Sequence, residues 1–156
     1  MSLPASLPEL NSGHFCECAL AERLFSSKVI LAGSSAGAGL AAGLSQACRD
    51  KNIPIWGVIL HVPMVCDYRH LPEAECPNPT SYVRCSTDVF LNSGEMKAIW
   101  DNAIPTADSN APSTLASPLL GNLAGLPQHL VFVTGQDPLR DEGMVYAGNL
   151  AENKVA

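Results

Sequence analysis

The chain has 156 residues, of which 47% are hydrophobic and 15% are charged, and its formal net charge is −6. This balance is typical of a folded globular domain rather than a disordered chain. The nine basic side chains are scattered without a run or a stripe, which argues against nucleic acid and anionic membrane surfaces as partners. No apolar stretch has the length of a membrane span, and the first ten residues lack the features of a secretory signal. We therefore expect a cytoplasmic protein with no membrane span.

The cysteines are interpreted as free thiols of a reducing compartment. The sequence contains no C-x-x-C pair, and the Cys16-x-Cys18 pair has no second cysteine or histidine pair at zinc-site spacing. We expect no metal site and no cofactor. Cys66, Cys76 and Cys85 lie in one proline-rich stretch, and the sequence leaves open whether two of them form a disulfide.

The amino-terminal part predicts an irregular lead-in followed by a strand–helix–strand unit. Residues 1–27 show no sustained periodicity, although residues 15–25 have the apolar spacing of a short helix. Residues 28–32 and 55–62 are apolar runs typical of strands buried on both faces of a parallel sheet. Residues 38–51, rich in alanine and leucine, predict the helix between them. This order implies parallel pairing with a right-handed crossover.

Residues 63–116 are rich in proline and show little regular pattern. One helix is predicted at residues 94–102, with Ser93 as its N-cap. A long irregular excursion inside a compact domain is usually functional, so we interpret this segment as a lid or pocket wall. A third apolar strand at residues 130–134 and a helix at residues 139–153 complete an α/β fold, a mostly parallel sheet flanked by helices.

The turn after the first predicted strand carries the motif most indicative of chemistry. Its sequence Gly33-Ser34-Ser35-Ala36-Gly37 matches G-x-S-x-G between a strand and a helix, the context of a nucleophile elbow. Ser35 is the predicted nucleophile, on a sharp and strained turn, and Gly33 and Gly37 supply the small residues that the close approach of strand and helix requires. The backbone N–H of Ala36, at the start of the helix, is the predicted half of an oxyanion hole.

The same turn admits a second interpretation, a nucleotide-binding loop. Gly33, Gly37 and Gly39 spell G-x-x-x-G-x-G after a strand, as in NADP-binding short-chain oxidoreductases. No tyrosine is followed by lysine four residues later, and no acidic residue ends the second strand to bind a ribose. We therefore keep this oxidoreductase as a secondary hypothesis.

The segment after the third strand, Asp137-Pro138-Leu139-Arg140-Asp141-Glu142-Gly143, carries a family resemblance. Together with the G-x-S-x-G turn, it resembles the hormone-sensitive-lipase-like esterases of the α/β-hydrolase fold-3 family. The resemblance implies that Asp137 is the acid of a Ser-Asp-His triad and that the substrate is a small-molecule carboxylic ester. Asp141 and Glu142 then become non-catalytic residues of the first helical turn, favourable to the helix dipole.

The chain departs from that family at several points. Ser34 and Ala38 replace the aspartate and second glycine that usually surround the elbow, and no H-G-G oxyanion loop precedes Ser35. No histidine occurs among the 19 residues after Asp137. The chain's four histidines all precede the acid, which makes them poor triad candidates: His14, His61, His70 and His129.

These departures predict a single partial hydrolase domain, truncated at both ends. We count three strands where the resemblance implies about eight, so one sheet edge is expected to be unpaired. As written, the chain is expected to be nearly or wholly inactive. The alternative is a non-catalytic ligand-binding module, like the receptor branch of the same family. Four apolar residues are candidates either for an acyl pocket or for plain core packing: Phe90, Met96, Ile99 and Trp100.

Overall fold

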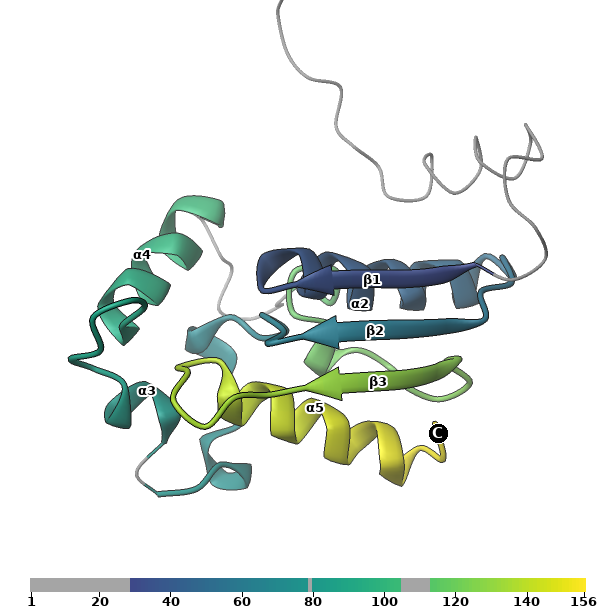
Figure 1. Ribbon diagram of the computed structural model, residues 1–156. Helices are drawn as coiled ribbons and strands as arrows, with labels where there is room; N and C mark the ends of the chain where they lie inside the picture. Colours follow the sequence, from purple (N-terminus) through teal and green to yellow (C-terminus); the bar gives the residue numbers. More distant parts are fainter. Residues whose placement is uncertain (1–28, 79, 105–112) are drawn as a thin grey trace, which may run out of the picture.

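Three parallel strands form the centre of the molecule (Figure 1). The computed structural model describes residues 29–78, 80–104 and 113–156. The strands are β1 (Ile30–Ser34), β2 (Gly57–His61) and β3 (Gln128–Phe132), in the spatial order β1-β2-β3. Ser34 lies opposite His61, and His61 lies opposite Phe132, so the carboxyl ends of all three strands meet at one edge. The α/β fold class predicted from the sequence is confirmed.

The two long helices pack on the same face of this sheet. They are α2 (Ala36–Asp50) and α5 (Arg140–Glu152), and both contribute to one core cluster with Val58 and Leu60 of β2. Val58 and Leu60 are two residues apart on a strand and so point to the same side. Both are at most 2% exposed, and apolar side chains of α2 and α5 therefore cover that side.

The opposite face of the sheet is exposed in the described part of the chain. Ile30, Ile59, Leu130 and Phe132 are each between 36% and 51% exposed. This corrects the prediction of strands buried on both faces. An apolar run shows that a strand is suited to burial, but it does not identify what covers each side. The predicted lead-in, residues 1–27, lies outside the described residues.

In its described residues, the excursion between β2 and β3 contains two helices and contributes most of a second core. The helices are α3 (Ser81–Arg84) and α4 (Ser93–Ala103). Asn92, not Ser93, is the N-cap of α4, because the Asn92 side chain accepts the Glu95 N–H and the Glu95 carboxylate accepts the Asn92 N–H. The described part of the chain also has three short 3-10 turns: η1 (Tyr68–His70), η2 (Glu73–Glu75) and η3 (Pro118–Leu120).

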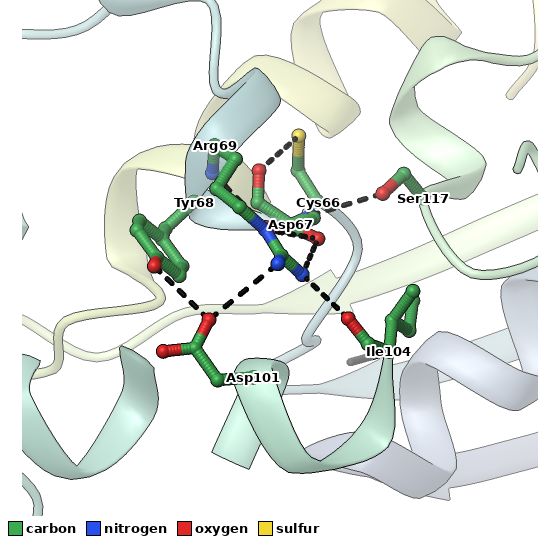
Figure 2. Close-up of polar contacts among 7 residues, drawn as sticks. All are labelled: Cys66, Asp67, Tyr68, Arg69, Asp101, Ile104 and Ser117. Carbon is green, nitrogen blue, oxygen red and sulfur yellow. Dashed lines mark hydrogen bonds and ion pairs between the residues drawn. The ribbon is translucent and has the colours of Figure 1, made fainter. Parts of the chain in front are cut away.

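An ion-pair network around Arg69 attaches the carboxyl end of α4 to the segment after β2 (Figure 2). The Arg69 guanidinium donates to both Asp67 oxygens, at 2.9 Å and 2.6 Å, and to the Ile104 carbonyl at 3.2 Å. Asp101 accepts from the Tyr68 hydroxyl at 3.1 Å and lies 3.5 Å from Arg69. Burial alone would raise the pKa of Asp67, but the hydrogen bonds from Arg69 outweigh burial and hold that pKa below its usual value.

Candidate active site

The backbone at Ser35 has the conformation that a nucleophile elbow requires. Ser35 follows β1 directly and caps α2, with φ 54° and ψ −122°. A positive φ is uncommon for a residue with a side chain, and such strain costs about 1–3 kcal/mol. The Ser35 carbonyl accepts three N–H groups, from Ala38 at 3.0 Å, Gly39 at 3.1 Å and Met64 at 3.2 Å. These bonds hold the strained turn against both α2 and the segment after β2.

Only one of the two elbow glycines is required by lack of space. A Cβ atom placed on Gly33 would lie 2.2 Å from the Gly37 carbonyl oxygen, closer than any real contact. A Cβ placed on Gly37 would meet nothing within 4 Å. The close approach of strand and helix that the sequence predicted therefore demands glycine at position 33, and the steric argument does not extend to Gly37.

Ala36 and Gly37 supply the first two N–H groups of α2, directly after Ser35. Ala36 is the first residue of α2, and the first N–H groups of a helix have no acceptor within it. The partial positive charge at this end favours an anion near Ser35. Ala36 therefore stands where the predicted oxyanion donor would be needed.

His61 contacts the residue before the predicted nucleophile. The Ser34 hydroxyl and His61 Nδ1 are 3.0 Å apart, and the His61 carbonyl accepts the Ser35 N–H at 2.9 Å. His61 thus fixes the position of the turn through two adjacent residues. His61 is exposed at the carboxyl end of β2.

Of the other described histidines, His129 lies near the opposite end of the sheet from the elbow. The His129 ring contacts Tyr146, and its Nδ1 lies 2.7 Å from the Pro127 carbonyl, at the amino-terminal half of β3. Burial lowers the pKa of His129, although the Pro127 carbonyl acts in the opposite direction. His70 belongs to η1. His14 lies outside the described residues.

Asp137 lies in the turn after β3, at the same sheet edge as Ser35. Its Oδ1 accepts the Leu139 N–H at 2.8 Å, and its Oδ2 accepts the Thr134 hydroxyl at 3.4 Å. β2 separates the strand that leads to Ser35 from the strand that leads to Asp137. The parallel sheet thus brings the two predicted triad residues to one edge from positions about a hundred residues apart.

A pocket of about 390 Å³ borders Asp137. Its lining separates some of the four residues that were candidates either for an acyl pocket or for core packing. It is lined by the residues from Asp88 to Leu91 and from Gln136 to Pro138, and within it the Phe90 side chain is fully exposed. Met96 and Trp100, by contrast, are at most 3% exposed and belong to the core of the excursion. Of the four candidates, Phe90 and Ile99 are exposed, Phe90 beside Asp137, whereas Met96 and Trp100 serve packing.

Asp141 and Glu142 have a structural role that the sequence did not reveal. Both belong to the first turn of α5, as predicted, but both are fully buried. Glu142 Oε1 accepts the N–H groups of Val65 at 2.7 Å and Cys66 at 3.1 Å. Burial raises the pKa of Glu142 well above its usual value, and the two backbone hydrogen bonds only partly oppose this rise. No periodicity marks such a residue, because its partners lie far away in sequence.

The described residues show neither a disulfide nor a metal cluster. Cys66, Cys76 and Cys85 are free thiols, so the disulfide that the sequence left open does not form among them. Within the described ranges no group of three His, Cys, Asp or Glu side chains could hold a metal ion. None of the helices in these ranges combines the length and the apolar character that a membrane crossing needs.

Comparison with known proteins identifies relatives along most of the chain. Residues 14–156 match the alpha/beta hydrolase fold family. An acetyl-hydrolase of Streptomyces hygroscopicus is 30% identical over 115 residues, which are 74% of this chain and 36% of the relative. A vibralactone cyclase structure is similar with a TM-score of 0.77 at 27% identity, covering 92% of this chain and 44% of that one. A hyperthermophilic esterase from the archaeon Pyrobaculum calidifontis has a TM-score of 0.68 at 32% identity, covering 81% and 40%. The chain thus spans less than half the length of each.

Proposed function

Because the chain belongs to the alpha/beta hydrolase fold family, we propose that Ser35 is the nucleophile of a carboxylic-ester hydrolase. The observation that carries the proposal is the backbone of Ser35, strained at φ 54° and ψ −122° between β1 and α2. Strain of this kind persists where the surrounding structure enforces it, and it is characteristic of functional sites. The family assignment also favours this function over the nucleotide-binding oxidoreductase.

The proposed reaction assigns a separate role to each group. Ser35 Oγ attacks the ester carbonyl carbon, an imidazole base takes the hydroxyl proton, and the Ala36 N–H donates to the oxygen that becomes negative. Collapse of the tetrahedral intermediate releases the alcohol, which takes up the proton, and water then hydrolyses the acyl-serine. Asp137 orients the imidazole and stabilises its charged form.

The described residues do not supply the imidazole base. The His61 carbonyl accepts the backbone N–H of Ser35, but no ring nitrogen of a described histidine is hydrogen-bonded to the Ser35 hydroxyl. We therefore propose that the 156-residue chain acylates slowly by itself. Imidazole added in solution should accelerate the reaction, because Ser35, Ala36 and the Asp137 carboxylate are already in place at one sheet edge.

The substrate class proposed is a small ester. The acetyl-hydrolase and esterase relatives support this class, and the pocket beside Asp137 offers Phe90 as an apolar contact. No cofactor enters the proposed chemistry.

The decisive experiment compares two adjacent serines. The chain is incubated with p-nitrophenyl acetate, with and without imidazole, and acetylated residues are located by mass spectrometry. Ser35→Ala should abolish acetylation of the protein. It should also abolish that part of the imidazole-dependent hydrolysis of p-nitrophenyl acetate that requires this acetylation. Ser34→Ala is the matched control, because Ser34 is exposed and bonded to His61, and it should retain acetylation at Ser35.

Equal acetylation of the wild type and Ser35→Ala would refute the nucleophile assignment. If no acetylation occurs although the variants are folded, a non-catalytic ligand-binding role becomes the better description. Binding of a non-hydrolysable ester analogue, measured by calorimetry, would then support it.

A further inference from the structure

An apolar groove of about 380 Å³ lies between β1 and α2, apart from the pocket beside Asp137. As far as the described residues form it, its lining has no polar or charged side chain. It consists of Gly37, two alanines and four leucines, namely Leu31, Leu40, Leu44 and Leu115. Leu40 is 67% exposed and Leu115 is 49% exposed. Apolar side chains that gather around one open hollow mark a site for an apolar ligand.

Two glycines of α2 shape this groove in different ways. Gly43 allows Leu115 to approach the helix, because a Cβ atom on Gly43 would lie 2.8 Å from the Leu115 carbonyl oxygen. Gly37 lines the groove, and a Cβ atom there would meet nothing within 4 Å. Packing therefore does not require the second glycine of the G-x-S-x-G turn. Access to the groove supplies a reason for it, since a large side chain at position 37 would occupy space that the groove leaves open.

The groove begins at the proposed nucleophile. Gly37 follows Ser35 by two residues, so their Cα atoms are at most about 7 Å apart. Gly37 and Leu44 are seven residues apart on α2, so the lining extends for about 10 Å along that helix. A molecule held at Ser35 can therefore extend an apolar chain along α2 without a break in the apolar lining.

The arrangement of the strands decides which part of an ester would lie in the groove. The imidazole that Asp137 orients must also return a proton to the leaving alcohol, so the alcohol lies on the Asp137 side of the carbonyl carbon. Asp137 follows β3, and the groove borders β1, the outer strand on the other side of the described sheet. The acyl chain is then the part of the ester directed toward the groove.

We propose that this groove binds the acyl chain of an aliphatic ester while Ser35 attacks the carbonyl carbon. Each methylene that leaves water for the leucine-lined groove favours binding, so the preferred substrates carry a medium-length acyl chain in place of an acetyl group. A charged acyl group would lose hydration without gaining a partner, because the lining offers none. The inference rests on the proposed ester hydrolysis and names the acyl part of its substrate.

The first test compares acyl chains on the same leaving group. The full chain reacts with p-nitrophenyl acetate, butyrate or hexanoate, and acylation of Ser35 is followed by mass spectrometry. In each reaction Ser35 Oγ bonds to the acyl carbon, p-nitrophenolate leaves, and the hydroxyl proton passes to solvent. At low ester concentration the rate should rise roughly twofold to fourfold for each added methylene.

A lysine in the groove should remove this dependence on chain length. Leu40→Lys places a charge in the apolar lining and should flatten the ratio of the hexanoate rate to the acetate rate. The matched control is Met144→Lys, because Met144 is 56% exposed on α5, and it should keep the wild-type ratio. The ratio separates binding from folding, since a partly unfolded variant loses both rates together. Equal rates for acetate and hexanoate in the wild type would refute the groove as the acyl site, whereas a folded chain that no ester acylates at Ser35 would refute the proposed hydrolysis.

The second test measures binding without any reaction. Octanoate, a possible hydrolysis product, is added to the full chain with labelled leucine methyl groups, and acetate serves as the control without a chain. Octanoate should shift the methyl resonances of Leu40, Leu44 and Leu115 in nuclear magnetic resonance spectra, and acetate should not. Unchanged resonances of these leucines would overturn the proposal. Contacts to Leu40 from another part of the chain or from a second copy, present before octanoate is added, would assign the groove to that occupant and would also overturn it.

Discussion

The Asp141 Oδ2 atom accepts the backbone N–H of Ser81 at 2.6 Å, which bonds the first turn of α5 directly to the first turn of α3. The Ser81 hydroxyl in turn donates to the Pro138 carbonyl at 2.7 Å, one residue after Asp137. Two hydrogen bonds thus hold the turn bearing the predicted triad acid against the excursion. Arg140 and Arg84 lie 2.7 Å and 3.4 Å from Asp141 and balance its buried charge.

Removing the Asp141 carboxylate should destabilise the fold. Asp141→Ala leaves the buried Ser81 N–H unpaired and Arg140 without its partner, which should lower the free energy of unfolding by about 3 kcal/mol. Urea denaturation provides the measurement. The control is Asp50→Asn, whose carboxylate pairs with Arg49 but is 64% exposed, and it should change stability by less than about 1 kcal/mol. Similar losses in the two variants would contradict the role assigned to Asp141.

The two elbow glycines should respond differently to alanine. Gly33→Ala places a Cβ against the Gly37 carbonyl and should destabilise the chain by about 1–3 kcal/mol, as overpacked substitutions do. Gly37→Ala finds open space inside a helix, where alanine is favoured over glycine by roughly 1 kcal/mol. Thermal unfolding should therefore show a lower Tm for the first variant and an unchanged or higher Tm for the second. A loss of stability in Gly37→Ala would show that the helix does not begin as described.

Replacing Ser35 with glycine should stabilise the protein while removing its nucleophile. Glycine adopts a positive φ without steric cost, so relief of backbone strain at φ 54° should contribute about 1 kcal/mol. Ser35→Ala, which loses the hydroxyl but keeps the Cβ, should not gain this stability. Urea denaturation of the two variants separates strain from chemistry. Equal stability of the two variants would indicate that the turn is not strained.

Stability should fall with rising pH because of Glu142. The unfolded glutamate ionises near its usual pKa of about 4.3, whereas burial holds the folded pKa well above that value. Between the two pKa values the unfolded state binds fewer protons than the folded state, so the free energy of unfolding decreases by up to about 1.4 kcal/mol per pH unit. Glu142→Gln should remove this slope.

The matched control for this titration is Glu152→Gln, because Glu152 is exposed at the other end of α5. It should keep the pH dependence of the wild type. Denaturation curves at several pH values above 4 provide the measurement. A wild-type slope that persists in Glu142→Gln would assign the titration to another group.

The sequence by itself determined the features that depend on neighbouring residues. The apolar runs and the helix between them predicted a parallel α/β arrangement, and the G-x-S-x-G turn predicted the strained backbone at Ser35. These features depend on local rules, namely side-chain periodicity and the space available in a tight turn. The strand bounds were less accurate: residues 28–32 were predicted where β1 spans Ile30–Ser34. Strand ends depend on the pairing partner, which the local pattern does not contain.

Only the tertiary structure decided which side chains meet across long separations. Asp141 and Glu142 looked like ordinary first-turn acids, but their partners Ser81 and Val65 are 60 and 77 residues away. In the sequence, Phe90 and Trp100 were equal candidates for a pocket wall. Packing buries Trp100 and leaves Phe90 exposed beside Asp137. Burial and pairing at such distances follow from how whole elements pack. A short sequence pattern determines the conformation of its own segment, but it carries no record of what that segment will contact.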